Sequence, residues 1–149
     1  MNTKCYIFNK VINIMVLVIG VLTLLMLGPN IDRMFPVVQP FNVESVKLTD
    51  TTVEIHGTAV KPRDCKPIDV QVLAYDSGNK TTLGSIKYLD TNSGAIPARP
   101  KSTNLQNWGP WILDVPENTV MVELSALHHC HILWDTRTHF ASINLKEYK

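Results

Sequence analysis

The stretch IDVQVLAY, residues 68–75, decides the fold. Its first, third, fifth and seventh residues are apolar, and this period of two is typical of a β-strand with one buried face. Similar apolar runs lie on both sides of it, separated by turn signals, and no segment after residue 42 has a convincing helical period. The expected strands are 43–48, 53–60, 68–75, 83–89, 108–115, 120–126 and 140–145. About seven strands without a helix predict an all-β domain, an antiparallel β-sandwich that is immunoglobulin-like by analogy of fold class.

A long apolar segment, 11–28 (VINIMVLVIGVLTLLMLG), precedes these strands and contains no charged residue. It is long enough to cross the ~30 Å hydrocarbon core of a bilayer as a helix. The residues at its end, Met26-Leu27-Gly28-Pro29, do not fit the small-residue pattern of a signal-peptidase site. We therefore expect one retained transmembrane helix, a signal anchor.

The basic residues that flank this helix predict its orientation. Lys4 and Lys10 precede it, whereas the first residues on its far side offer only Arg33. Because cytoplasmic flanks carry the excess of Lys and Arg, the N-terminus is expected in the cytoplasm and the C-terminal domain outside. The expected organisation is a cytoplasmic flank (1–10), a transmembrane helix (11–28), a stalk (29–42) and an extracytoplasmic β-sandwich domain (43–149).

The expected stalk contains three prolines, which favour an extended and fairly stiff chain. Its apolar residues leave a second interpretation open. Val37, Val38 and Phe41 could begin to pack against the domain instead of forming part of a free spacer.

Two cysteines, Cys65 and Cys130, fall in the expected external domain, and Cys5 lies on the cytoplasmic flank. Two thiols in an oxidising compartment usually pair. The loop between them has about 65 residues, for which chain entropy predicts roughly 4 kcal/mol of stabilisation. We expect one disulfide bond between Cys65 and Cys130.

Strand order predicts where the unusual residues gather. If consecutive strands alternate in direction, the connections 61–67, 90–107 and 128–137 emerge at the same end of the sandwich. Loops at one end of a rigid scaffold are the usual place for binding residues. The candidate binding residues there are Arg63, Arg99, Lys101, Trp108, His129, His131 and Trp134.

Two other interpretations of these residues remain open. Cys65, His129, Cys130 and His131 include the thiolate and imidazole ligands that zinc prefers, although their spacing matches no familiar zinc motif and no Met follows as a copper ligand. Trp108 is either an exposed platform for a ligand or, with Trp111, part of the core. The segment 134–139 carries an acid, a base and a histidine, but reads more simply as a solvated turn.

The net charge and the short sequence motifs limit the classes of function that the sequence indicates. The net charge is +1 and the basic residues are scattered, so nucleic acid is not indicated as a partner. Nucleophile elbows, zinc-protease motifs, phosphate-binding loops and close carboxylate pairs are all missing from the sequence. Catalysis is therefore not favoured, although a hydrolase without a recognisable motif stays a third interpretation.

Three short motifs carry a resemblance to a known group of proteins. Arg63-Asp64-Cys65 (R-D-C), the segment 107–111 (N-W-G-P-W) and the segment 128–134 (H-x-C-H-x-x-W) resemble, together with the anchor, small uncharacterised single-pass membrane proteins of tailed phages and prophages. The resemblance implies a bacterial inner membrane, with the domain in the periplasm, and no known activity. We expect a membrane-anchored binding or interaction module without a cofactor, held in the lipid bilayer by 11–28 and facing a protein or envelope partner. The alternative is a metal-binding (Zn or Cu) or thiol-redox protein.

Overall fold

The computed structural model describes residues 3–91, 93 and 95–148, and the chain divides into two compact units between Phe35 and Pro36. The first unit holds a helix, α1 (Thr3–Asp32), and the second holds the β-domain. Each unit is described below by itself.

Helix α1 has the composition of a membrane-spanning segment. The most apolar 18-residue window within Phe8–Asp32 has a mean hydropathy of 2.7, and none of that window is buried. Two of its polar side chains bond to the helix itself: Thr23 Oγ1 donates to the Ile19 carbonyl at 2.8 Å, and Asn30 Nδ2 donates to the Met26 carbonyl at 3.0 Å. Such bonds satisfy polar groups within the helix, as a hydrocarbon environment requires. The expected single N-terminal apolar helix is confirmed, and it is long and apolar enough to cross a membrane.

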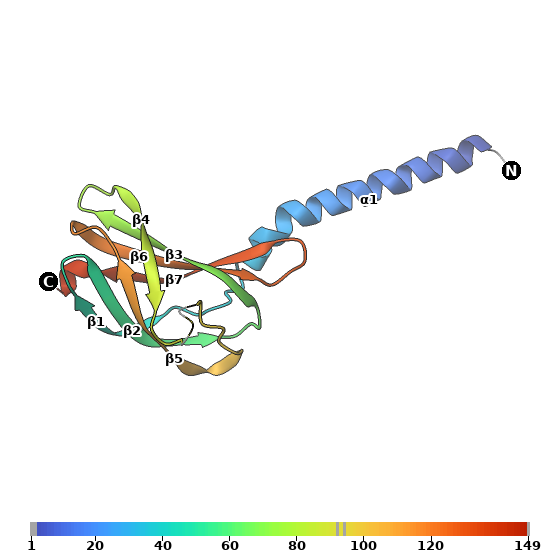
Figure 1. Cartoon of the computed structure of the whole chain (residues 1–149). Helices are drawn as coiled ribbons and strands as arrows, with labels where there is room; N and C mark the ends of the chain where they lie inside the picture. Colours follow the sequence, from blue (N-terminus) through green and yellow to red (C-terminus); the bar gives the residue numbers. More distant parts are fainter. Residues whose placement is uncertain (1–2, 92, 94, 149) are drawn as a thin grey trace. The chain divides into compact units, whose positions relative to one another are not determined.

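The described residues of the β-domain form seven strands and one short 3-10 helix, η1 (Leu145–Glu147). The strands form one curled sheet in the order β1-β2-β5-β4-β3-β6-β7, and every neighbouring pair is antiparallel. The predicted all-β architecture is confirmed (Figure 1). The strands are β1 (Asn42–Leu48), β2 (Thr52–Lys61), β3 (Lys66–Asp76), β4 (Thr81–Tyr88), β5 (Ser102–Asp114), β6 (Thr119–His129) and β7 (Asp135–Asn144).

Strand β4 joins the two halves of the sheet. Its first residues, Thr81 to Gly84, pair with β3, and its last residues, Ser85 to Tyr88, pair with β5. The change of partner falls at Gly84, where a Cβ atom would lie 2.8 Å from the Asp114 carbonyl oxygen. Only glycine leaves room for the backbone of β5 to approach so closely. The sheet therefore curls about β4, and its halves face each other in Figure 1.

The core fills the space between the two halves. Alternate residues point inward in β6, in the first half of β2 and in the second half of β3, as the period of two predicted. Rings from the two halves meet there: Trp111 of β5 lies edge-on to Phe140 of β7, with centroids 6.3 Å apart. The most deeply buried of the larger aliphatic side chains described are Val37, Val53, Ile55, Val72, Leu113, Val122 and Leu124.

Residues 36–41 are part of the domain and not a free stalk. Val37, Val38 and Phe41 are buried in the core. The Gln39 amide donates to the Val60 carbonyl at 2.9 Å in β2, and the Phe41 amide donates to the Phe140 carbonyl at 2.6 Å in β7. This segment, here called the seam, thus bonds to strands from both halves of the sheet.

The boundaries of three predicted segments need correction. The expected stalk at 29–42 is helical up to Asp32 and forms the seam from Pro36, so its prolines do not produce a continuous extended spacer. The last third of the long loop predicted at 90–107 belongs to β5, which begins at Ser102 because its first residues pair with the end of β2. Strand β7 begins at Asp135 and not at Phe140; the segment 134–139 is therefore mostly strand, with Thr136 and Thr138 buried, and not a solvated turn.

Candidate functional site

The connections β2–β3, β4–β5 and β6–β7 meet at one end of the β-domain, here called the loop end (residues 61–66, 89–101 and 129–135). Strand directions alternate along the sheet, so each of these connections leaves from the same end. Direct contacts join them: Lys61 Nζ reaches the Arg99 carbonyl, and Arg63 Nη2 lies 3.5 Å from His131 Nε2.

A disulfide bond between Cys65 and Cys130 ties the first and third connections, as the sequence predicted. The last pair of the β3–β6 ladder is Lys66 and His129. In an antiparallel ladder the next opposite pair is therefore Cys65 and Cys130, whose Cα atoms are 4.8 Å apart. The bond closes the ladder at the loop end.

Lys61 ties the first and second connections. Its side chain is buried, and Nζ donates to the Cys65 carbonyl at 3.0 Å and to the Arg99 carbonyl at 2.6 Å. Burial lowers the pKa of Lys61, and the nearby Asp64 carboxylate opposes this effect. The ammonium group therefore stabilises the position of two loops. Sequence reasoning missed this role because it placed Lys61 in the connection 61–67, where a lysine is usually exposed.

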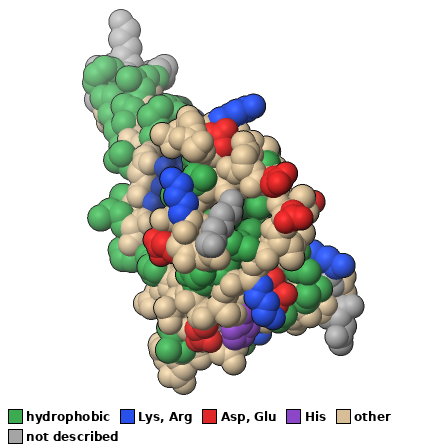
Figure 2. Space-filling view, turned by 90° about the vertical axis from the view of Figure 1, so that its left-hand side faces the viewer, with side chains coloured by type: hydrophobic (Ala, Val, Ile, Leu, Met, Phe, Trp, Pro, Cys, Tyr) green, Lys and Arg blue, Asp and Glu red, His purple; other side chains and the backbone are tan. Residues whose placement is uncertain are grey.

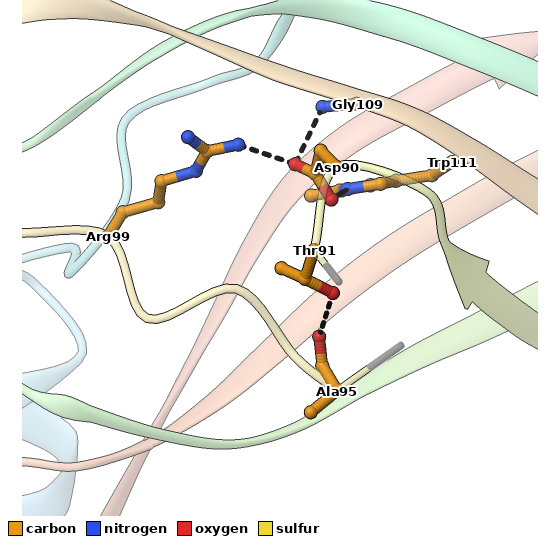
Figure 3. A network of polar contacts seen from close by, with 6 residues as sticks. All are labelled: Asp90, Thr91, Ala95, Arg99, Gly109 and Trp111. Carbon is orange, nitrogen blue, oxygen red and sulfur yellow. Dashed lines mark hydrogen bonds and ion pairs between the residues drawn. The ribbon is translucent and has the colours of Figure 1, made fainter. Parts of the chain in front are cut away.

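Asp90 organises the β4–β5 connection (Figure 3). One of its oxygens accepts from Trp111 Nε1 at 3.1 Å, and the other accepts from the Gly109 amide at 3.1 Å and from Arg99. Arg99 also stacks over Trp108, with Cζ 5.6 Å from the ring centroid. Arg99, a candidate binding residue, is thus held in a packed network that positions its own loop.

The two tryptophans of the β5 strand belong to the core. Trp111 is almost completely buried and packs against Tyr88, Phe41 and Trp108. Trp108 is also buried, with its ring 5.7 Å from that of Trp111. Of the two interpretations left open, the structure places these residues in the core.

The histidines near Cys130 in the sequence lie in different surroundings. His128 is buried, and burial, followed by the charges of Lys61 and Arg63, lowers its pKa to about 4. His129 is exposed, with Nδ1 2.8 Å from a carboxylate oxygen of Asp135. His131 packs against Trp134, with ring centroids 4.8 Å apart.

The disulfide bond and the positions of these histidines can be compared with the metal site proposed from the sequence. Both sulfurs share one disulfide bond, so neither Cys65 nor Cys130 is available as a thiolate ligand in this state. Within the described part of the chain, no three His, Cys, Asp or Glu side chains form a group that could hold a metal ion. The ligand set proposed from the sequence, which includes His129 and His131, is therefore not assembled here.

Two large aliphatic side chains, Ile132 and Leu133, are exposed at the tip of the β6–β7 connection. Ile132 is 94% exposed and Leu133 is 54% exposed. Lys101, on the second connection, is exposed as well. Sequence reasoning missed the tip; two consecutive aliphatic residues between a cysteine and a tryptophan, in a connection that should be polar, were the available signal.

The opposite end of the domain holds an open pocket of about 370 Å³. The β1–β2 turn, the β5–β6 turn and Tyr148 line it. Acidic and basic side chains are interspersed among the described residues on this face (Figure 2). The pocket brings together none of the candidate residues expected from the sequence.

Comparison with protein-family models, curated protein sequences and solved structures gives no match to this chain. The functional argument therefore depends on the chain's own geometry.

Proposed function

We propose that the protein is a membrane-anchored binding module. In this proposal α1 is a signal anchor in a bacterial inner membrane, and the β-domain lies in the periplasm, where its loop end binds a protein or other envelope partner. The protein is proposed to act without catalysis. The resemblance to small phage and prophage membrane proteins supports the bacterial setting and a phage or prophage origin.

One observation carries the proposal: the polar side chains of the loop end that could act in catalysis are already engaged in hydrogen bonds and ion pairs with other groups of the domain. Asp90 accepts three hydrogen bonds, Lys61 donates to two carbonyls, and His129 contacts Asp135. These contacts build a rigid platform, and they leave exposed positions such as Lys101 and Ile132 on its surface. Rigid presentation of exposed side chains favours binding, because little conformational entropy is lost when a partner docks.

Site-specific cross-linking tests this proposal. A photoreactive amino acid at position 101 of the full-length chain, expressed in a bacterial host, should give a discrete adduct with a partner. The matched control is position 80, an exposed lysine in the turn between β3 and β4 at the other end of the domain. Adducts from position 80 and none from position 101 would show that the binding surface lies at the opposite end of the domain from the one proposed.

The proposed anchoring has its own test. An alkaline phosphatase fused after residue 149 should be active in a bacterial host, because that enzyme needs the periplasm to form its disulfide bonds. The full-length chain should stay in the inner-membrane fraction and keep its N-terminal residues. A soluble mature chain that begins after Gly28 would show that the helix is a cleaved signal peptide.

The alternative function is metal binding or thiol-redox chemistry at Cys65 and Cys130. It requires reduction of their disulfide bond, because a bonded sulfur is not a thiolate. Metal analysis of the purified protein with and without reductant distinguishes the two functions. Stoichiometric zinc in the reduced protein would favour the alternative.

A further inference from the structure

The tip of the β6–β7 connection is an apolar projection on a rigid base. Ile132 exposes almost its whole side chain and Leu133 more than half of its own. Large aliphatic side chains that project singly into water are common, but two consecutive ones at the outermost point of a loop form a small apolar wedge.

The base of this wedge is fixed on both sides. Cys130 is bonded to Cys65 on the neighbouring strand, and His129 and Asp135 face each other as the last pair of the β6–β7 ladder. Trp134 follows the tip in the chain and packs against His131, which precedes it. The wedge cannot fold back into the core, because the chain is held in place immediately before and after it.

Few residues separate the seam from α1 along the chain. The seam enters the domain beside the loop end: the Val37 amide donates to Thr138 Oγ1, three residues after the start of β7. Three residues, 33–35, separate the end of α1 at Asp32 from Pro36. The four Cα–Cα steps from Asp32 to Pro36 span about 14 Å at most, at ~3.6 Å per step.

We propose that Ile132 and Leu133 insert into the lipid surface of the membrane that holds α1. This inference rests on the proposed anchoring, since α1 must lie in a bilayer for the short connector to bring the loop end to it. The connector also supplies exposed apolar side chains, Met34 and Phe35, of the kind found at membrane interfaces. A groove on another protein could also bind the wedge. The short connector favours lipid, because it keeps the β-domain near the bilayer in which α1 is proposed to lie.

The wedge needs the anchor in order to bind. Two aliphatic side chains bind a bilayer only weakly when the domain is free, whereas a short tether keeps them at a high effective concentration next to it. The test therefore uses the full-length chain, inserted into phosphatidylcholine vesicles with either ordinary or brominated acyl chains. Bromine quenches the fluorescence of a tryptophan that touches the acyl region.

The probe is an added tryptophan, Ile132→Trp, and the matched control is Leu83→Trp. Leu83 is 72% exposed on β4, near the β3–β4 turn at the other end of the domain, so both variants add the same side chain at an exposed aliphatic position. After subtraction of the parent chain's signal, emission from the tryptophan at position 132 should fall about twofold in brominated vesicles, because its ring would lie at the interface. Emission from the tryptophan at position 83 should not change.

Three results would overturn the inference. Equal emission from position 132 in both kinds of vesicle would show that the tip stays in water while α1 is inserted. Equal quenching at positions 132 and 83 would show that tryptophan inserts from any exposed site. Loss of the chain from the vesicles in alkaline carbonate would remove the anchoring itself, and with it the proposed function; the first two results leave that function intact.

Discussion

Cys65 and Cys130 lie directly opposite each other, one position beyond the last pair of the β3–β6 ladder, with their Cα atoms 4.8 Å apart. The disulfide bond thus continues the ladder, and it closes a loop with a sequence separation of 65 residues. A covalent bond at this point fixes two of the three connections that form the loop end.

Replacement of Cys65 and Cys130 together by alanine should destabilise the β-domain by about 4 kcal/mol, the loop entropy of a 65-residue closure. The measurement is urea unfolding of residues 36–149, compared with the oxidised parent protein. Mass spectrometry of the parent should show a cross-linked peptide pair that reductant separates. Two free thiols in the untreated parent would contradict the prediction.

The substitution Asp90→Ala should cost about 3 kcal/mol, because it leaves the Trp111 indole N–H and the Arg99 guanidinium without their carboxylate partner. Denaturant unfolding measures this loss. Lys101→Ala is the matched control: Lys101 is exposed in the same connection, so its replacement should change stability by less than about 0.5 kcal/mol. Similar losses in both variants would mean that the Asp90 network does not hold the loop.

Stability should depend on pH through His128. Burial lowers its pKa in the folded chain to about 4 from the ordinary value of 6.5, so the unfolded chain binds the proton more readily. The stability that neutral His128 contributes is fully present above pH ~6.5, falls as the pH drops, and is lost below about pH 4. The full effect is about 3 kcal/mol.

The variant His128→Gln isolates this contribution, because glutamine does not titrate. Unfolding free energies of the parent and the variant should diverge between pH 4.5 and pH 7, with the parent gaining more stability as pH rises. A difference that stays constant over this range would show that His128 does not titrate on unfolding.

The seam predicts where a stable soluble version of the domain must begin. A chain that starts at Val43 lacks Val37, Val38 and Phe41, and the loss of these buried side chains should destabilise it by several kcal/mol relative to a chain that starts at Pro36. Thermal unfolding of the two versions checks this. Equal melting temperatures would show that the seam is dispensable.

The sequence predicted those features that depend on local alternation. The period of two in β3 and β6 identified the strands, and the strand count then placed Cys65 and Cys130 at one end. Features that depend on a partner strand were missed. The first half of β5 reads as a loop because its residues are polar, and pairing with β2, Lys61 opposite Ser102, makes it a strand. In β7 the inward-facing residues Thr136 and Thr138 are polar, like the outward-facing residues beside them. The sequence there therefore shows no alternation of apolar and polar residues.

The candidate site was predicted less well, for a related reason. The charge of Arg99 and its place in a loop indicated a free binding residue, but nothing in the sequence links it to Asp90 or to the face of Trp108. Such pairings follow from the closing of the sheet, which brings distant segments together. Exposed charge and buried charge look the same in a sequence until the fold is known.

The seam also sets the order of events during biosynthesis. Val37 bonds to a residue 101 positions later, and Phe41 bonds to Phe140, so these two core residues find their hydrogen-bond partners only after β7 has been made. Cys65 likewise waits for Cys130. The domain therefore cannot complete its fold until its last strand has been made, and until then Val37 and Phe41 lack these partners and are open to chaperones and proteases.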